Sequence, residues 1–175
     1  MLEFIRNFLF QKKIKRTLRK HPGRKDPVNP GKEIGILCTI DKADNIQAVV
    51  RYREKLVEKG KKVKILAFSN TKEELLHIPF PYFNRKDITW FDSVKGDNLL
   101  DFTKSNYDLL INLDLDNNKP IHFIAKVASA RLKVATFLAE EDFYQIMINL
   151  DKEKANISDL IGQISQTLNT LSSAK

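Results

Sequence analysis

Five polar side chains stand where two apolar runs, each suited to a buried strand, come to an end. These candidate ligand residues are Thr39, Asp41, Asn112, Asp114 and Asp116. Carboxylate oxygens suit Mg²⁺ or Mn²⁺, so the Asp-x-Asp pair at 114 and 116 would be the place for a divalent cation. The competing interpretation is a solvated loop, in which Asp and Asn side chains form turns and cap the next helix. Because an isolated Asp-x-Asp spacing is common by chance, we expect no bound metal and no other cofactor.

The first turn after an apolar run lacks the glycines of a nucleotide site. A dinucleotide fold needs glycines at this turn so that the backbone can approach the pyrophosphate. Residues 41–45 contain no glycine, and Asp41 and Asp44 place two carboxylates where a phosphate would bind. The chain also has no Walker A loop. These features argue against a conventional nucleotide site.

Histidine and cysteine, which often carry catalysis, are few and scattered in this chain. His21, His77 and His122 have no spacing typical of metal ligands, so we interpret them as structural. Cys38 is the single cysteine and stands within an apolar run, where a buried thiol acts as a small hydrophobic residue. A nucleophilic role for Cys38 is the alternative, but the glycines of a nucleophile elbow are absent. We therefore predict no catalytic residue and favour a non-enzymatic protein.

The distribution of charge is the most distinctive property of the 175-residue chain. Its net charge is +8, with 30 basic and 22 acidic residues. Residues 1–32 contain ten basic and two acidic residues, so the rest of the chain holds 20 of each sign and is neutral. A neutral body with a basic arm is expected when one segment contacts a polyanion or an anionic membrane. The residues predicted to make that contact are Lys12, Lys13, Lys15, Arg16, Arg19, Lys20, Arg24 and Lys25.

Three interpretations of this basic arm remain open. In the first, which we favour, its cations contact phosphates of RNA, with the ribosome as the leading partner, in a salt-sensitive and sequence-independent way. In the second, the protein is a peripheral membrane protein, whose apolar tip enters the bilayer while the cations meet anionic headgroups. The tip residues are Leu2, Phe4, Ile5, Phe8 and Leu9. In the third, the tip packs on the body and the cations are only solvated.

No apolar run reaches the length of about 18 residues that a membrane-spanning helix needs. The first apolar stretch, residues 4–10, is interrupted by Arg6 and Asn7, and no small-residue cleavage site follows it. This stretch is therefore not typical of an export signal. We predict a cytoplasmic protein in which Cys38 stays reduced, associated through its arm with the ribosome or the inner membrane.

Strand-like and helix-like segments alternate along the chain and must position these residues. We expect a basic N-terminal helix within residues 1–20, a Pro- and Gly-rich linker at 21–32, and an α/β domain at 33–175. The expected strands are 34–40, 63–68, 88–91, 107–113, 132–137 and 144–150. The expected helices are 43–59, 71–77, 97–103, 121–130 and 157–171, with a loop at 78–83.

Three residues mark expected helix ends: Asp44 as an N-cap, Gly60 as a stop and Pro120 in a first turn. Alternating strands and helices predict a parallel sheet that is covered on both faces. The expected fold class is therefore α/β. We predict a single Rossmann-like three-layer domain with a mostly parallel five- or six-stranded sheet, in the central order 3-2-1-4-5.

Two resemblances add to this interpretation. The basic N-terminal helix and the segments 65–69, 107–111 and 146–150 resemble an uncharacterised bacterial family of short α/β proteins, a domain of unknown function. Locally, residues 107–113 and 121–137 are similar to the first Rossmann-like domain of heptosyltransferase-type glycosyltransferases. That likeness implies a sugar-nucleotide site between two such domains, whereas this chain has the length for one. As an alternative function, it implies a glycosyltransferase-like domain that binds a metal or nucleotide ligand at the acidic rim.

Overall fold

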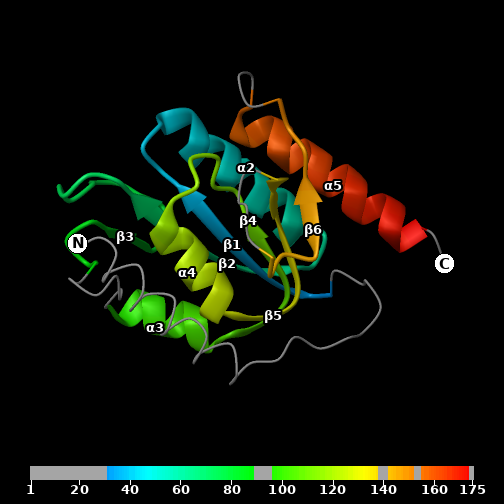
Figure 1. Ribbon diagram of the computed structural model, residues 1–175, viewed down its shortest axis with the longest axis horizontal. Helices are drawn as coiled ribbons and strands as arrows, with labels where there is room; N and C mark the ends of the chain where they lie inside the picture. Colours follow the sequence, from blue (N-terminus) through cyan, green and yellow to red (C-terminus); the bar gives the residue numbers. More distant parts are fainter. Residues whose placement is uncertain (1–30, 89–95, 138–141, 152–154, 174–175) are drawn as a thin grey trace.

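The structure is a computed structural model and describes residues 31–88, 96–137, 142–151 and 155–173 (Figure 1). Its elements follow one another as β1 (Glu33–Thr39), α2 (Ala43–Glu58), β2 (Lys62–Ser69), β3 (Tyr82–Asn84), α3 (Asp97–Lys104), β4 (Asn106–Asn112), α4 (Lys119–Val127), β5 (Ser129–Thr136), β6 (Ile146–Ile148) and α5 (Ile157–Ser173). The predicted basic helix and most of the linker lie outside the described residues. Among the helices that the structure describes, none is both long and apolar enough to span a membrane.

All six strands lie parallel in one sheet, in the order β3-β2-β1-β4-β5-β6. β1 and β4 are neighbours at its centre, where Ile34 pairs with Leu109 and Ile36 pairs with Ile111. The chain extends from β1 to β3 on one side, then returns to β4 and extends to β6 on the other. This doubly wound order has its switch point between β1 and β4. The predicted Rossmann-like α/β fold and its central strand order are confirmed.

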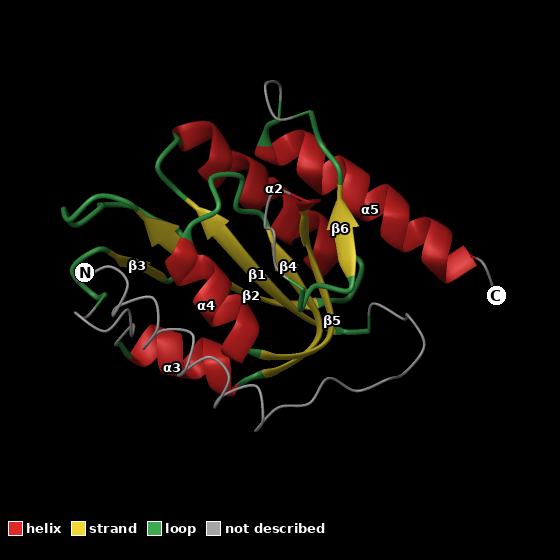
Figure 2. Ribbon diagram, in the orientation of Figure 1, coloured by secondary structure: helices red, strands yellow, loops and turns green. Residues whose placement is uncertain are grey.

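Two of the described helices cover each face of the sheet, so the domain has three layers (Figure 2). Successive residues of β1 point toward opposite faces of the sheet. Ile36 and Cys38 pack in the core beneath α2 and α5, whereas Leu37 packs in the core beneath α3 and α4. Because a parallel sheet is buried on both faces, its central strands are continuous apolar runs. This property explains why the central strands could be predicted from the sequence.

The third strand, β3, overlaps the end of the segment 78–83 that the two prolines predict to be a loop. β3 pairs with β2 just after Pro81, whose carbonyl accepts the N–H of Ala67 at 3.0 Å. Proline removes an N–H donor, but an edge strand needs ladder donors on one side only, so it tolerates nearby prolines. The strand predicted at 88–91 is not a strand of the described sheet. Ile88 forms an isolated bridge, and the other residues of that segment lie outside the described ranges.

The prediction of a short helix at residues 71–77 is wrong. His77 has a backbone φ of 62°, in the left-handed region, which a right-handed helix excludes. The Thr71 hydroxyl accepts the N–H of Glu73 at 3.0 Å, a local turn that competes with helical hydrogen bonding. The Tyr82 hydroxyl then fixes the loop, since it accepts the N–H of Leu75 at 2.9 Å and donates to the Leu75 carbonyl at 3.2 Å.

The sequence correctly predicts the residue that ends α2 but not the residue that caps its start. Gly60 has a φ of 72° and follows the helix as predicted. Its N–H and that of the next residue donate to the carbonyls of Val57 and Leu56, at 2.8 and 3.0 Å, which forms a Schellman motif. At the start of the helix the N-cap is Lys42, and Asp44 lies in the first turn instead of capping it. A carboxylate there still interacts favourably with the helix dipole.

α4 ends at Val127, three residues before its predicted end, and Pro120 lies in its first turn as predicted. Ser129 and the next residue pair with β4, so β5 begins almost at once. The Lys133 amine of β5 donates to the carbonyls of residues 125 and 126, at 2.7 and 3.3 Å. These bonds satisfy carbonyl groups in the last turn of α4, which have no partner within a helix.

The buried thiol of Cys38 should make the domain less stable at alkaline pH. Burial raises the pKa of this thiol from 9.0 to about 12, and the carboxylate of Asp114 adds to the increase. Its stabilising contribution is thus complete below pH 9 and is lost as the pH rises through 12. We expect wild type to lose about 1.4 kcal/mol more than Cys38→Ala between pH 8 and pH 10.

The measurement is urea unfolding of both proteins at each pH. The substitution itself changes the free energy of unfolding by the same amount at both pH values, and all other groups titrate alike in the two proteins. Both contributions therefore cancel when the pH-dependent changes in the free energy of unfolding are compared. Parallel pH profiles would show that the Cys38 thiol ionises as easily in the folded chain as in the unfolded chain.

Candidate functional site

The candidate ligand residues lie at the carboxyl edge of the sheet, around the switch point between β1 and β4. Asp41 follows β1 by two residues, Asn112 is the last residue of β4, and Asp114 comes two residues later. Thr39 ends β1 and is buried, with 2% of its surface exposed. Doubly wound folds bind their ligands in the crevice at this position. The partners of these side chains therefore decide what the edge can do.

Asp41 is bonded to the end of the neighbouring strand β2. One of its carboxylate oxygens accepts the Ser69 hydroxyl and the backbone N–H of Asn70, both at 2.9 Å. The other oxygen accepts the side-chain amide of Asn70, also at 2.9 Å. That amide reaches Asn118 as well, donating to its side-chain oxygen at 3.2 Å. Asp41 is thus connected through Asn70 to the loop that follows β4.

Asp114 organises that loop. Its Oδ1 accepts the backbone N–H of Asp116 at 3.1 Å and the side-chain amide of Asn118 at 2.8 Å. Its Oδ2 accepts the backbone N–H of Asn118 at 2.5 Å. Between them Asn117 adopts a φ of 54°, which Asn tolerates better than most residues. Asp114 is buried, with 3% exposed, whereas Asp116 is exposed.

A second set of buried polar side chains continues from Asp114 beneath the loop. Asn112 accepts the N–H of Asp114 at 2.9 Å and donates its amide to the Tyr144 hydroxyl at 2.8 Å. That hydroxyl lies 3.2 Å from Nδ1 of His122, and Nε2 of the same ring lies 3.8 Å from Oδ2 of Asp114. All four side chains are at most 7% exposed. Buried polar networks of this kind hold separate segments in one arrangement.

This geometry limits what the edge can do chemically. Divalent cations bind through carboxylate oxygens, but three N–H or O–H donors of the chain already bond the carboxylate of Asp41 and three that of Asp114. Within the described ranges, no three His, Cys, Asp or Glu side chains lie together as a metal site. The Arg85 guanidinium also donates to the Asn70 side chain at 3.2 Å, which places a cation beside this network. The arrangement links four segments of the chain across the switch point.

The sequence predicts the aspartates and Asn112 at this edge, but it does not indicate that Tyr144 and His122 belong to the same network. The sequence pattern predicts Tyr144 as part of a strand and His122 as a structural residue without a metal-ligand spacing. The structure places Tyr144 two residues before β6, and His122 in the first turns of α4. One signal for His122 is present in the sequence. It lies one helical turn after Asn118, the N-cap of α4, and therefore near the polar loop that follows β4. Nothing in the spacing of Tyr144 indicated a partner 32 residues earlier in the chain.

The arm joins the body at the opposite edge of the sheet, where the strands begin. The carboxylate of Asp108 accepts the N–H groups of Lys32 and Glu33, at 2.8 and 3.1 Å. The Glu33 and Lys32 N–H groups and the guanidinium of Arg131 hold the pKa of Asp108 below its usual range. Lys61 donates to the carbonyl of Gly31 at 2.6 Å. These contacts fix the point at which the chain enters β1. The predicted contact residues of the arm, and its apolar tip, lie outside the described residues.

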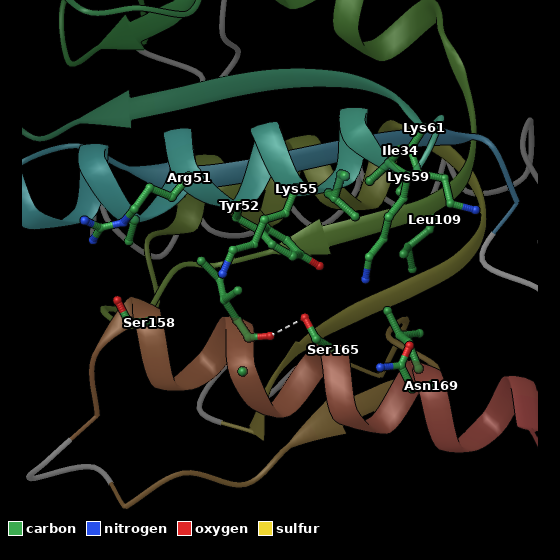
Figure 3. Close-up of a pocket in the computed structure, with 15 residues that line it drawn as sticks. Ile34, Arg51, Tyr52, Lys55, Lys59, Lys61, Leu109, Ser158, Ser165 and Asn169 are labelled. Carbon is green, nitrogen blue, oxygen red and sulfur yellow. Dashed lines mark hydrogen bonds between the residues drawn. The ribbon is translucent and has the colours of Figure 1, made fainter.

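A groove opens at this same edge, between α2 and α5 (Figure 3). It has a volume of about 440 Å³. Its floor includes Ile34, near the start of β1, and its pairing partner Leu109, in the middle of β4. Lys61, which holds the entry point of the arm, also lines the groove. The groove therefore lies beside the point at which the chain enters β1.

These observations define a class: a single Rossmann-like domain whose switch point is bridged by its own side chains. Within that class the chain belongs to a family of unknown function (DUF6913), whose model matches residues 6–171. The predicted membership of an uncharacterised family is thereby confirmed. No curated protein and no solved structure matches the chain.

Proposed function

We propose that the protein is a non-enzymatic docking protein whose basic arm binds a polyanion, with ribosomal RNA as the first candidate. One observation carries the proposal: the entire net charge of +8 belongs to residues 1–32, and the rest of the chain is neutral. Lysine and arginine side chains on a connected arm can neutralise successive phosphates and release their counterions. Such contacts position a protein on RNA without reading its sequence.

Two structural features support this proposal. The arm enters the body through a fixed joint, because Asp108 accepts the N–H groups of both Lys32 and Glu33. A joint of this kind lets an arm bound to RNA hold the body in a defined place. At the opposite edge, Asp41 and Asp114 have their oxygens occupied by hydrogen bonds within the chain. This favours a binding role over metal-dependent catalysis at the switch point.

A second candidate function is peripheral attachment to an anionic membrane through the same arm. The observation that favours it is the apolar tip that precedes the cations, made of Leu2, Phe4, Ile5, Phe8 and Leu9. Apolar side chains insert at the headgroup boundary while adjacent cations meet anionic lipids. RNA binding leaves this tip without a role, whereas membrane binding uses both parts of the arm.

Neutralising the arm should release the protein from ribosomes. We expect wild type to sediment with ribosomes through a sucrose gradient at low salt, and to lose about 10³–10⁵ in affinity between 50 and 200 mM salt. The variant in which Lys12, Lys13, Lys15 and Arg16 are all changed to Gln should remain at the top of the gradient. The matched control changes four exposed lysines of the body to Gln, namely Lys72, Lys86, Lys104 and Lys119, and should sediment like wild type.

The same gradient separates the candidates. Sedimentation with membranes that persists after ribonuclease treatment would replace RNA by a lipid surface as the partner. Sedimentation with ribosomes that both variants lose equally would show that net charge, and not the arm, determines binding. Wild-type protein at the top of the gradient in every condition would contradict both functions of the arm.

A further inference from the structure

We propose that the groove between α2 and α5 binds a single-chain anionic amphiphile, a long-chain fatty carboxylate. The apolar chain would lie on the floor of the groove, and the carboxylate would meet the cations of α2. This site is separate from the residues that carry the proposed function.

The size and floor of the groove fit a small apolar ligand. Its volume of about 440 Å³ falls in the range of about 300–1,000 Å³ that is typical of small-molecule sites. The floor is formed by Ile34, Ala48, Leu109 and Leu168. The floor side chains come from two strands and both helices, so the groove reaches down to the sheet. An apolar chain placed there would be removed from water, which is favourable in proportion to the buried area.

The α2 wall of the groove is strongly cationic. Arg51, Lys55 and Lys59 follow one another at intervals of four residues, which places them on one side of the helix. Figure 3 shows the amines of Lys55 and Lys59 directed across the gap toward α5. With Lys61, four cations line the groove, and the described lining residues include neither Asp nor Glu. Like charges four residues apart destabilise a helix, so this stripe favours an anion.

The α5 wall contributes only uncharged residues to the lining, and at Ser165 it meets the Tyr52 side chain of α2. Ser158, Gly162, Ser165 and Asn169 line the groove at helical spacing. A Cβ added at Gly162 would meet no atom within 4 Å, so there is open space in front of this residue. The acidic residue of α5, Asp159, does not line the groove. α5 therefore provides space for a ligand but no charge to balance the α2 stripe.

Charge and shape together select the occupant. An apolar floor beneath a cationic wall matches a molecule with an apolar chain and an anionic head. The basic residues 12–25 of the same chain carry the same sign of charge as the α2 stripe, so they cannot supply its counter-charge. A free phosphate would make no use of the apolar lining, and a neutral lipid would bring no anionic group to the cations of α2. A straight-chain carboxylate satisfies both parts of the groove.

The test uses the full chain and the fluorescent fatty acid 11-(dansylamino)undecanoate. We expect saturable binding at one site per chain. Laurate should displace the probe, whereas dodecanol and dodecyltrimethylammonium, which have a similar chain length with a neutral or a cationic head, should not. Non-saturable binding, or equal displacement by dodecanol, would overturn the proposal.

Two variants address the groove directly. Gly162→Leu should fill it and weaken binding by about tenfold or more, while leaving the melting temperature unchanged or raised because leucine is a better helix former. The double variant Lys55→Glu, Lys59→Glu should weaken binding to a similar extent. The matched control Lys72→Glu, Lys86→Glu changes two exposed lysines outside the groove and should bind like wild type. Unchanged affinity in Gly162→Leu would overturn the proposal.

The outcome is independent of the proposed function. The variant with glutamine at Lys12, Lys13, Lys15 and Arg16 should bind the fatty acid as tightly as wild type does. Loss of binding in that variant would assign the fatty acid to the arm and would overturn the groove as its site. Failure of ribosome sedimentation would not change the fatty-acid result.

Discussion

Asp114→Ala should lower the free energy of unfolding by about 3 kcal/mol, because it leaves several polar groups without an acceptor. The Asp114 carboxylate accepts the backbone N–H groups of Asp116 and Asn118 and the side-chain amide of Asn118. It is buried, with 3% of its surface exposed, so water replaces these bonds poorly. Urea unfolding followed by far-ultraviolet circular dichroism measures the change.

Asp116→Ala is the matched control, since it removes the same chemical group two residues away. Asp116 is exposed, and we expect a change within about 0.5 kcal/mol. Equal effects of the two substitutions would show that the network around Asp114 does not hold the loop. The pair also tests the cation interpretation. An increase in melting temperature with Mg²⁺ that both substitutions abolish would restore the Asp-x-Asp pair as a metal site.

Gly35→Ala should destabilise the domain by about 2 kcal/mol, because the added methyl group has no room. Gly35 lies in β1 and faces α3 and α4. A Cβ at this position would lie 2.8 Å from Leu110 Cδ1 and 3.0 Å from the Tyr107 ring. The ring cannot move aside cheaply, because its hydroxyl donates a buried hydrogen bond to the Phe102 carbonyl at 2.9 Å. Thermal and urea unfolding should both show the lower stability of Gly35→Ala.

Gly162→Ala provides the opposite control, because the same change of atoms occurs in open space. Gly162 is a helical residue of α5, and its added Cβ would meet nothing within 4 Å. Replacing glycine by alanine inside a helix should stabilise the protein by about 1 kcal/mol. The two substitutions should therefore change stability in opposite directions. Destabilisation of similar size at both positions would contradict the argument from local space.

The fold could be predicted because its signals are local. The central strands are continuous apolar runs, and Gly60 marks the end of α2 within the sequence itself. β3 escaped prediction because it is three residues long and follows a pair of prolines. Its place in the sheet depends on pairing with β2, which a local pattern does not contain. The helix predicted at 121–130 extends too far for the same reason, because the end of α4 is set by the pairing of Ser129 with β4.

The sites depended even more on contacts between distant residues. The aspartates at the ends of β1 and β4 could be placed at one edge of the sheet from strand order alone. That their oxygens are occupied follows from Asn70, which comes directly after β2, and from Asn118, which lies four residues after Asp114 in the same loop. The groove could not be predicted either, because its walls are helices separated by about 100 residues of chain. Only the helical spacing of Arg51, Lys55 and Lys59 was visible in the sequence.

The two outermost strands have a consequence for how copies of this protein behave when crowded. β3 and β6 have three residues each, whereas the inner strands have seven or eight. An edge strand exposes unpaired backbone groups that can recruit another chain, and a short edge limits this intermolecular pairing. A protein that gathers on a long polyanion reaches a high local concentration. Its short sheet edges would then protect neighbouring copies from joining edge to edge into aggregates.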